Sequence, residues 1–284
     1  MGEKKLNERA LLLRLSIGQW TARKQDKKIK AEVEQQYNAT DAISVHKALI
    51  AKSALETISK KVTQVRDYVY THTLPWVDEG VRLVPAVDIL SLSQTLREEK
   101  QECEKLFEEF VANYPAMIET ARASLNGLFN EADYPNPAKV ARKFYMEFTF
   151  EPIPESAGFV SLQGFIQNEL DDMSQNYEDR VRTATAAAMK DLYMRLHKVI
   201  SAAHERLIDP DNKFKDSLVS NIVELVNLLP RLNVTGDEEL ERLRREAEEK
   251  LTKYDAQSLR DYPMMRKEVA DGAADLLKKM EGYV

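Results

Sequence analysis

The sequence predicts a mainly α-helical protein: an elongated helical bundle or antiparallel coiled coil of long helices, with a small three-stranded β-sheet. Three observations carry this prediction. Only nine glycines and ten prolines occur in 284 residues, far fewer than the frequent turns of a many-stranded protein require. Apolar residues recur at steps of three and four over two long stretches, the spacing of one helix face. In three short segments they alternate with polar residues instead, which is the period of a strand.

We expect one elongated domain that spans the whole chain. Its expected parts are a small sheet contributed by residues 10–87 and 144–154, long helices over 88–132 and 160–208, and C-terminal helices over 213–284.

The front of the chain is expected to fold as a strand followed by helices. Apolar residues alternate with one exception over residues 10–20, which predicts a half-buried strand. Residues 21–36 are polar and charged and predict a surface helix. Asp41 can cap the next helix, which carries apolar residues at helical spacing to about Thr73 and is stopped by Pro75.

The middle of the chain predicts two strands with a long helix between them. Val81 is the centre of a short extended segment over residues 79–88, and the apolar stripe of the first long helix follows it. Pro115 lies inside this stripe, so we expect a kink or two helices end to end. From Met146 to Phe150 apolar and polar residues alternate again, which predicts a strand with one buried face.

The second long helix, residues 160–208, has an apolar stripe with a mean step of about 3.75 residues, closer to an eleven-residue repeat than to a heptad. Its seam is therefore expected to be straight or slightly right-handed. At about 1.5 Å per residue it would be roughly 70 Å long. Shorter helices are expected over residues 214–232, 236–254 and 264–281.

Charge is distributed unevenly along the sequence. The net charge is −6, yet residues 1–66 hold 14 basic and 7 acidic side chains. Such a front segment suits an acidic partner, or the acidic remainder of the same chain. With one cysteine, no secretory leader pattern and no apolar run of membrane-spanning length, we expect a cytoplasmic protein that does not contact a membrane.

The residue patterns of common catalytic sites are missing from the sequence. No Glu-x-x-His, His-Glu-x-x-His or phosphate-binding glycine loop occurs, so we expect no metal, no cofactor and no enzymatic activity. His197 and His204 share a helix face and are interpreted as surface or flanking histidines. Cys103 falls on an apolar stripe among glutamates, which would raise the pKa of a thiol, and is interpreted as a packing residue.

The best candidate contact surface lies near the front of the chain. Its residues are Trp20, Arg23, Lys24, Lys27 and Lys28. Cations beside an aromatic ring suit phosphate backbones and unpaired bases. The alternative interpretation is a solvated helix or a protein contact, in which Trp20 attaches the small sheet to the bundle.

Two segments of the chain are distinctive. The first is the LSI-x-x-W-x-x-RK element, residues 15–24. The second is a Tyr-Pro pair at Tyr134 and Pro135, followed by an aromatic strand and the Pro-Ile-Pro of residues 152–154. Together they resemble a family of uncharacterised proteins of tailed phages, plasmids and bacteria, the domain of unknown function numbered thirty-one fifty. Genes similar to it often lie near those of MoxR-type AAA+ ATPases and von Willebrand-type proteins in mobile elements. The resemblance therefore implies an adaptor or a component of a DNA-related module in the bacterial host cytoplasm, and it assigns no role to any residue.

These observations predict a non-enzymatic, phage-type interaction or adaptor protein that binds another protein, such as an AAA+ ATPase or a host complex, and that self-associates. Two alternatives stay open. One is a single-stranded nucleic-acid binding or DNA-handling accessory protein, and the other is an anti-defence inhibitor of a host immune complex.

Overall fold

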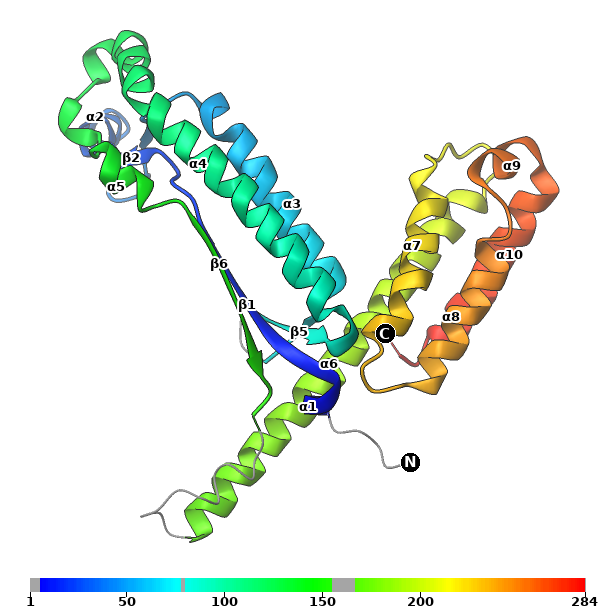
Figure 1. The fold of residues 1–284 in the computed structure, drawn as a ribbon. Coiled ribbons are helices and arrows are strands. Elements are labelled where there is room, and N and C mark those ends of the chain that lie inside the picture. The colour runs from blue at the N-terminus through cyan, green and yellow to red at the C-terminus, as the bar shows by residue number, and fades with distance from the viewer. Residues whose placement is uncertain (1–5, 78–79, 155–166, 284) are drawn as a thin grey trace. The chain divides into compact units, whose positions relative to one another are not determined.

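The computed structural model describes residues 6–77, 80–154 and 167–283. It confirms a mainly helical protein with a small sheet (Figure 1). The sheet has four strands in the order β4-β5-β1-β6, one more than expected. β1 (Ala10–Gly18), β5 (Val81–Pro85) and β6 (Tyr145–Pro152) are the three expected strands. The extra strand, β4 (Leu74–Pro75), pairs antiparallel with β5 and is too short to show an alternating pattern.

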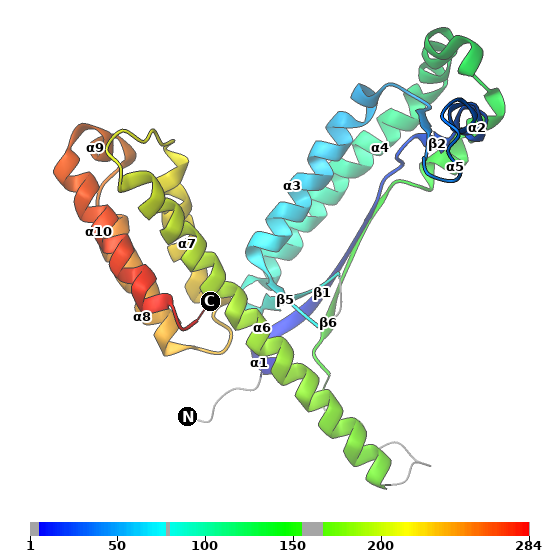
Figure 2. The ribbon, with the colours of Figure 1, turned by 180° about the vertical axis from the view of Figure 1, so that it is seen from behind.

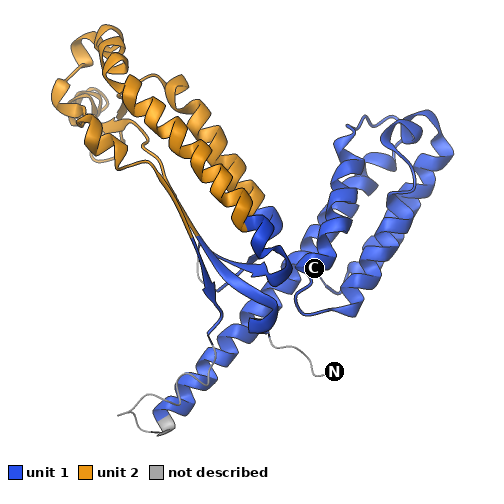
Figure 3. Ribbon diagram, viewed as in Figure 1, with its two compact units in different colours: residues 1–14, 70–92, 149–284 blue, residues 15–69, 93–148 orange. Residues whose placement is uncertain are grey.

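Two compact units make up the chain (Figure 3). Unit 1 combines residues 1–14, 70–92 and 149–284, and unit 2 combines residues 15–69 and 93–148. The single elongated domain expected from the sequence stays a prediction.

Unit 1 contains a bundle of four helices, which Figures 1 and 2 show side by side: α6 (Gln167–Leu207), α7 (Ser217–Leu232), α8 (Glu238–Leu251) and α10 (Pro263–Met280). The short helices α9 (Ala256–Asp261) and α1 (Leu6–Arg9) accompany them. The bundle core includes Leu196, Leu243 and Leu276, and Leu12 and Leu83 of the sheet belong to the same cluster. The predicted long helix and the predicted C-terminal helices therefore exist, although residues 160–166 lie outside the described residues.

A buried arginine fixes the loop that follows α6. Arg266 is only 7% exposed. It donates hydrogen bonds to the carbonyl oxygens of Arg206, Leu207, Asp209 and Asn212 at 2.7, 3.1, 2.5 and 2.8 Å. The last carbonyls of a helix have no partner within the helix and carry the negative end of its dipole. Arg266 therefore satisfies the C-terminal end of α6 with a donor from α10.

Unit 2 is built around α3 (Glu56–His72) and α4 (Ile89–Leu125), which lie side by side in Figures 1 and 2. The first turn of α4 follows a 3₁₀ turn, η2 (Ala86–Asp88), in unit 1. Val62 and Val65 of α3 are buried, as are Leu96 and Phe107 of α4. Lys61 of α3 also forms an ion pair with Glu99 of α4, with 2.6 Å between Nζ and Oε2.

Three predicted helix boundaries in unit 2 are wrong. The helix expected from Asp41 begins at Glu56 after a 3₁₀ turn, η1 (Lys52–Leu55), because His46–Ala48 form a strand, β3. The surface helix expected over 21–36 begins only at α2 (Lys27–Gln36), because Arg23–Gln25 form β2, which pairs antiparallel with β3. The first long helix ends at Leu125 rather than near 132.

Pro115 does not divide the first long helix. α4 continues through it as one element, so the expectation of two helices end to end is wrong. A proline in a helix interior removes one backbone hydrogen bond. Packing on the preceding turns offsets this cost, because Phe110 and Tyr114 are buried at 4% and 0% exposure.

Candidate functional site: the basic end of unit 2

Trp20 is buried and does not offer a surface for bases. Its side chain is 6% exposed. Its ring meets those of Tyr114 and Phe110 edge to face, with centroids 5.4 and 6.4 Å apart. Aromatic pairs prefer this geometry in protein cores. The structure thus places Trp20 in the core of unit 2, and the interpretation that it attaches the small sheet to the bundle stays a prediction.

The four basic residues predicted beside Trp20 do not lie on one helix. Arg23 and Lys24 belong to β2, whereas Lys27 and Lys28 form the start of α2. The reason is Asp26, which caps α2 by accepting a hydrogen bond from the backbone N–H of Ile29 at 3.1 Å and so fixes where the helix begins. All four basic side chains are exposed.

Two lysines of the two-stranded β2–β3 sheet share one carboxylate. Lys24 and Lys47 lie directly opposite each other in this sheet, an arrangement that destabilises a strand pair when both charges are alike. Asp133 resolves it, because its oxygens lie 2.7 Å from Lys24 Nζ and 2.5 Å from Lys47 Nζ. Its side chain is only 8% exposed. Lys24 is therefore paired within the scaffold, although its side chain is 48% exposed.

The pKa values of this cluster follow from the same contacts. Burial alone would raise the pKa of the Asp133 carboxyl, but the hydrogen bonds from Lys24 and Lys47 outweigh it, and the pKa lies below its usual value. The bond to Asp133 raises the pKa of Lys47. Asp133 and Lys47 therefore stay charged at neutral pH, and the β2–β3 sheet is tied to the segment around Asp133.

Two aromatic residues complete this attachment. The hydroxyl of Tyr134 donates to the carbonyl oxygen of Leu49, the residue after β3, at 2.7 Å. The ring of Tyr134 stacks on Phe129 with centroids 5.0 Å apart, and the guanidinium of Arg122 lies 4.4 Å from the Phe129 centroid. Arg122 lies in the last turn of α4. Phe129 directly follows a 3₁₀ turn, η3 (Asn126–Leu128), and Tyr134 directly follows another, η4 (Glu131–Asp133). The short helix α5 (Pro137–Ala141) comes next. The β2–β3 sheet and this segment form one unit of structure.

We name this part of unit 2, residues 20–52 and 122–144, the basic end. It holds 11 basic and 6 acidic side chains. Within the part of the chain that the structure describes, six of the basic side chains are exposed and make no ion pair or side-chain hydrogen bond: Arg23, Lys27, Lys52, Lys139, Arg142 and Lys143. The basic end therefore presents positive charge that the fold does not neutralise.

Sequence reasoning found only part of this surface. Arg23 and Lys27 were among the predicted residues, whereas Lys52 and the cations of α5 and its flank were missed. The available signal was the run KVARK, residues 139–143, which carries three cations in five positions. Nothing in the sequence indicated that the structure would place this run in the same unit as the β2–β3 sheet.

Lys27 and Lys28 occupy an electrostatically unfavourable position. They lie in the first turn of α2, which has no acidic residue there, and the N-terminal end of a helix dipole is positive. Lys28 has a weak partner in Glu32, at 3.9 Å and with both side chains more than half exposed. Exposed pairs of this kind contribute little to stability. These cations are thus poorly explained by folding.

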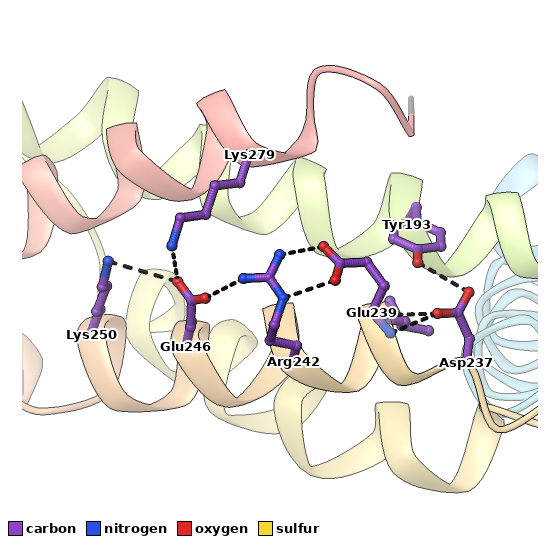
Figure 4. Close-up of polar contacts among 8 residues, drawn as sticks. Tyr193, Asp237, Glu239, Arg242, Glu246, Lys250 and Lys279 are labelled. Atoms are coloured by element: carbon purple, nitrogen blue, oxygen red, sulfur yellow. Dashed lines mark hydrogen bonds and ion pairs between the residues drawn. The ribbon is translucent and has the colours of Figure 1, made fainter.

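Unit 1 carries charge of a different kind, along α8. Arg242 bridges Glu239 and Glu246, with 2.7 Å between its Nη1 and Glu246 Oε1, and Glu246 also contacts Lys279 of α10 at 2.5 Å (Figure 4). At the start of α8, Asp237 accepts hydrogen bonds from two backbone N–H groups and from the Tyr193 hydroxyl, all at 3.0 Å. Glu239, Arg242, Glu246 and Lys279 thus each face an opposite charge, and the Glu246–Lys279 pair links α8 to α10.

The remaining candidate groups lie in ordinary surroundings. Cys103 is fully buried, and burial raises the pKa of its thiol. His204 Nδ1 lies 3.2 Å from the carbonyl oxygen of Ala270, and His197 Nδ1 lies 3.4 Å from Ser201 Oγ. Over residues 6–77, 80–154 and 167–283, no three metal-ligating side chains gather as an ion would need, and no helix is long and apolar enough to cross a bilayer.

Comparisons of the chain with protein-family models, with curated proteins and with solved structures find no match. The resemblance to the domain of unknown function stays a prediction.

Proposed function

We propose that the protein is a non-enzymatic adaptor that binds an acidic surface of a partner protein through its basic end. The observation that carries this proposal is the set of six exposed, unpaired cations on a scaffold that already uses Lys24 and Lys47 for its own cohesion. Complementary charge speeds association and selects partners. Burial of Trp20 favours a protein over unpaired bases, because it removes the aromatic surface on which bases would stack.

The structural setting also supports a binding role. Asp133 and the Tyr134 hydroxyl bind the β2–β3 sheet to the 122–144 segment, and the stacking of Tyr134 on Phe129 holds that segment together. A preformed surface loses less conformational entropy on binding than a mobile one. Removing the unpaired cations should therefore weaken binding without unfolding the surface that carries them.

A four-residue variant tests the proposal. It replaces unpaired cations of the basic end by alanine: Arg23→Ala, Lys27→Ala, Arg142→Ala and Lys143→Ala. A matched control removes the same charge from exposed positions of unit 1: Lys190→Ala, Lys198→Ala, Lys267→Ala and Lys278→Ala. Tagged wild-type protein, variant and control are used to recover partners from producing cells. We expect a partner that the wild type and the control retain and the basic-end variant loses. Equal recovery by all three proteins would refute the proposal.

The unpaired cations also favour a second candidate, binding to the phosphate backbone of nucleic acid. Such binding weakens as salt rises, with a slope of log affinity against log salt of about −0.7 per contacted phosphate on single strands. Fluorescence anisotropy with a labelled single-stranded oligonucleotide tests it. We expect the basic-end variant to lose about three units of slope if all four cations contact phosphates. A slope that is the same in wild type and variant would exclude this candidate.

The adaptor proposal includes self-association. The apolar stripes of the long helices are the proposed contact surfaces. Sedimentation velocity of the wild-type protein tests it. A single species of monomer mass over a wide concentration range would contradict it and leave the basic end as the proposed binding surface.

A further inference from the structure

α7 in unit 1 carries an exposed apolar residue beside the stripe that faces the core. Ile222, Val226 and Leu229 are buried and face the core. Val219 and Val223 form a second stripe, one turn apart. Val219 is partly buried and packs against the core, whereas Val223 is 37% exposed. A helix on a wet surface normally shows polar residues outside its buried stripe, so the exposed part of this second stripe is apolar surface that folding alone does not require.

The second stripe of α7 forms one wall of a groove. α9 and its N-cap form the other wall, and the groove has a volume of about 510 Å³. Its floor and walls include Val219, Val223 and Ala256, while Glu224 and Asp255 lie along it. The combination of apolar floor and flanking charge is typical of grooves that receive one face of a helix.

The walls of this groove are held in place. Arg260 of α9 is paired with Asp216, the residue before α7, and donates to the carbonyl oxygen of Phe214 at 3.2 Å. Its guanidinium also lies 5.0 Å from the centre of the Phe214 ring. Arg266 lies 5.4 Å from the same ring and fixes the loop that follows α6. The groove is therefore formed before any ligand arrives.

The charge that remains along the groove is negative. Arg260 and Asp216 neutralise each other. Glu224 is exposed and makes no ion pair with any described residue. Asp255 accepts a hydrogen bond from the backbone N–H of Ser258, and this bond lowers the pKa of its carboxyl, so it stays ionised. Arg260 also lines the groove, but its charge is taken up by Asp216, so two carboxylates flank the apolar residues without an ion pair to any described residue.

We propose that this groove binds a short amphipathic helix of a partner protein, with small or branched apolar residues on one face and Lys or Arg beside them. The apolar face would cover Val219, Val223 and Ala256, and the cations would pair with Glu224 and Asp255. The site is independent of the basic end, and the charge of its ligand is opposite to that of the basic end's ligand.

A defined peptide tests this proposal. The probe is a fluorescein-labelled amphipathic helix about four turns long, with leucines at steps of three and four and lysines beside them. Its control is the same peptide with glutamate in place of each lysine. In fluorescence anisotropy we expect the lysine peptide to bind the full-length protein and the glutamate peptide not to bind.

Two pairs of variants locate the site. Val223→Lys should weaken binding at least about tenfold, the effect of losing one buried apolar contact of about 1.4 kcal/mol. Met194→Lys, at a position of α6 that is 43% exposed and does not line the groove, should not weaken it. Glu224→Lys should weaken binding, whereas Glu249→Lys, the same change on α8, should not. The basic-end variant should bind the peptide as the wild type does, which separates this proposal from the proposed function.

Three results would overturn the proposal. They are equal binding of both peptides, equal binding by Val223→Lys and Met194→Lys, and a wild-type oligomer that Val223→Lys converts to a monomer. The last result would assign the groove to a second copy of this chain.

Discussion

The two units use charge in opposite ways. On α8 of unit 1, Arg242, Glu246 and Lys279 form a chain in which each charge faces its opposite, and the chain links α8 to α10 (Figure 4). In the basic end of unit 2, one buried carboxylate, Asp133, ties the scaffold together, while six exposed cations are left without a partner. The difference teaches that a high density of charged residues does not by itself indicate a binding surface. Only charges that the fold leaves uncompensated do so.

Asp133→Asn is expected to have the largest effect on stability. Asparagine keeps the shape of the side chain but removes the counter-charge that Lys24 and Lys47 share, leaving Asp26, 3.7 Å from Lys47 Nζ, as the remaining carboxylate partner of Lys47. Loss of one partner of a buried ion pair costs about 3 kcal/mol. Urea unfolding should show this loss, while Glu131→Gln, at a carboxylate that is 79% exposed, should change stability by less than about 0.5 kcal/mol.

The same substitution predicts a pH dependence with a definite sign. The pKa of Asp133 is lowered in the folded protein, so its contribution to stability is complete above the unfolded pKa, about 4. It is lost as the pH falls below that value through the folded pKa. The difference in stability between wild type and Asp133→Asn should therefore be full at about pH 6 and should shrink in acid. A difference that grows in acid would contradict the assignment.

Asp237→Ala is expected to have an intermediate effect, because Asp237 accepts partly buried hydrogen bonds at the start of α8. The change removes the cap of α8 and leaves the Tyr193 hydroxyl without its acceptor. We expect a loss of about 2 kcal/mol. Asp255→Ala removes the cap of α9 at an exposed site and should cost less than Asp237→Ala. Equal losses for the two variants would show that the Tyr193 contact contributes nothing.

Arg242→Gln is expected to have the smallest effect. Arg242 is exposed, and water and salt screen its pairs with Glu239 and Glu246. Thermal unfolding should show a small decrease in midpoint at low salt that disappears as salt is added. A large decrease that persists at high salt would mean that the α8 network holds the bundle together more strongly than exposed pairs normally do.

Long, regular patterns made most of the fold predictable. The apolar stripes of α4 and α6 and the alternation in β1 and β6 extend over many residues, so each element could be assigned from its period. The two-stranded β2–β3 sheet could not be assigned from the sequence. Its strands, RKQ and HKA, are three residues each and hold a single small apolar residue, so neither shows the period of a buried face.

Part of the candidate site was also predictable, because its first cations lie close together in the sequence. The cluster of cations near Trp20 is visible in the sequence, but its split between paired and unpaired members depends on Asp133, which is distant along the chain. The burial of Trp20 likewise depends on Phe110 and Tyr114 of α4. Contacts between distant segments decide which of the predicted residues remain available.

The contacts of Arg266 should withstand acid and high salt better than the ion pairs along α8. Its acceptors are four backbone carbonyls, which neither titrate nor lose a counter-ion. Low pH protonates glutamates, and high salt screens their charge. Either condition should weaken the ion pairs along α8 first. The loop after α6, anchored by neutral oxygens, should keep its form under both treatments, and the neighbouring groove should keep its walls.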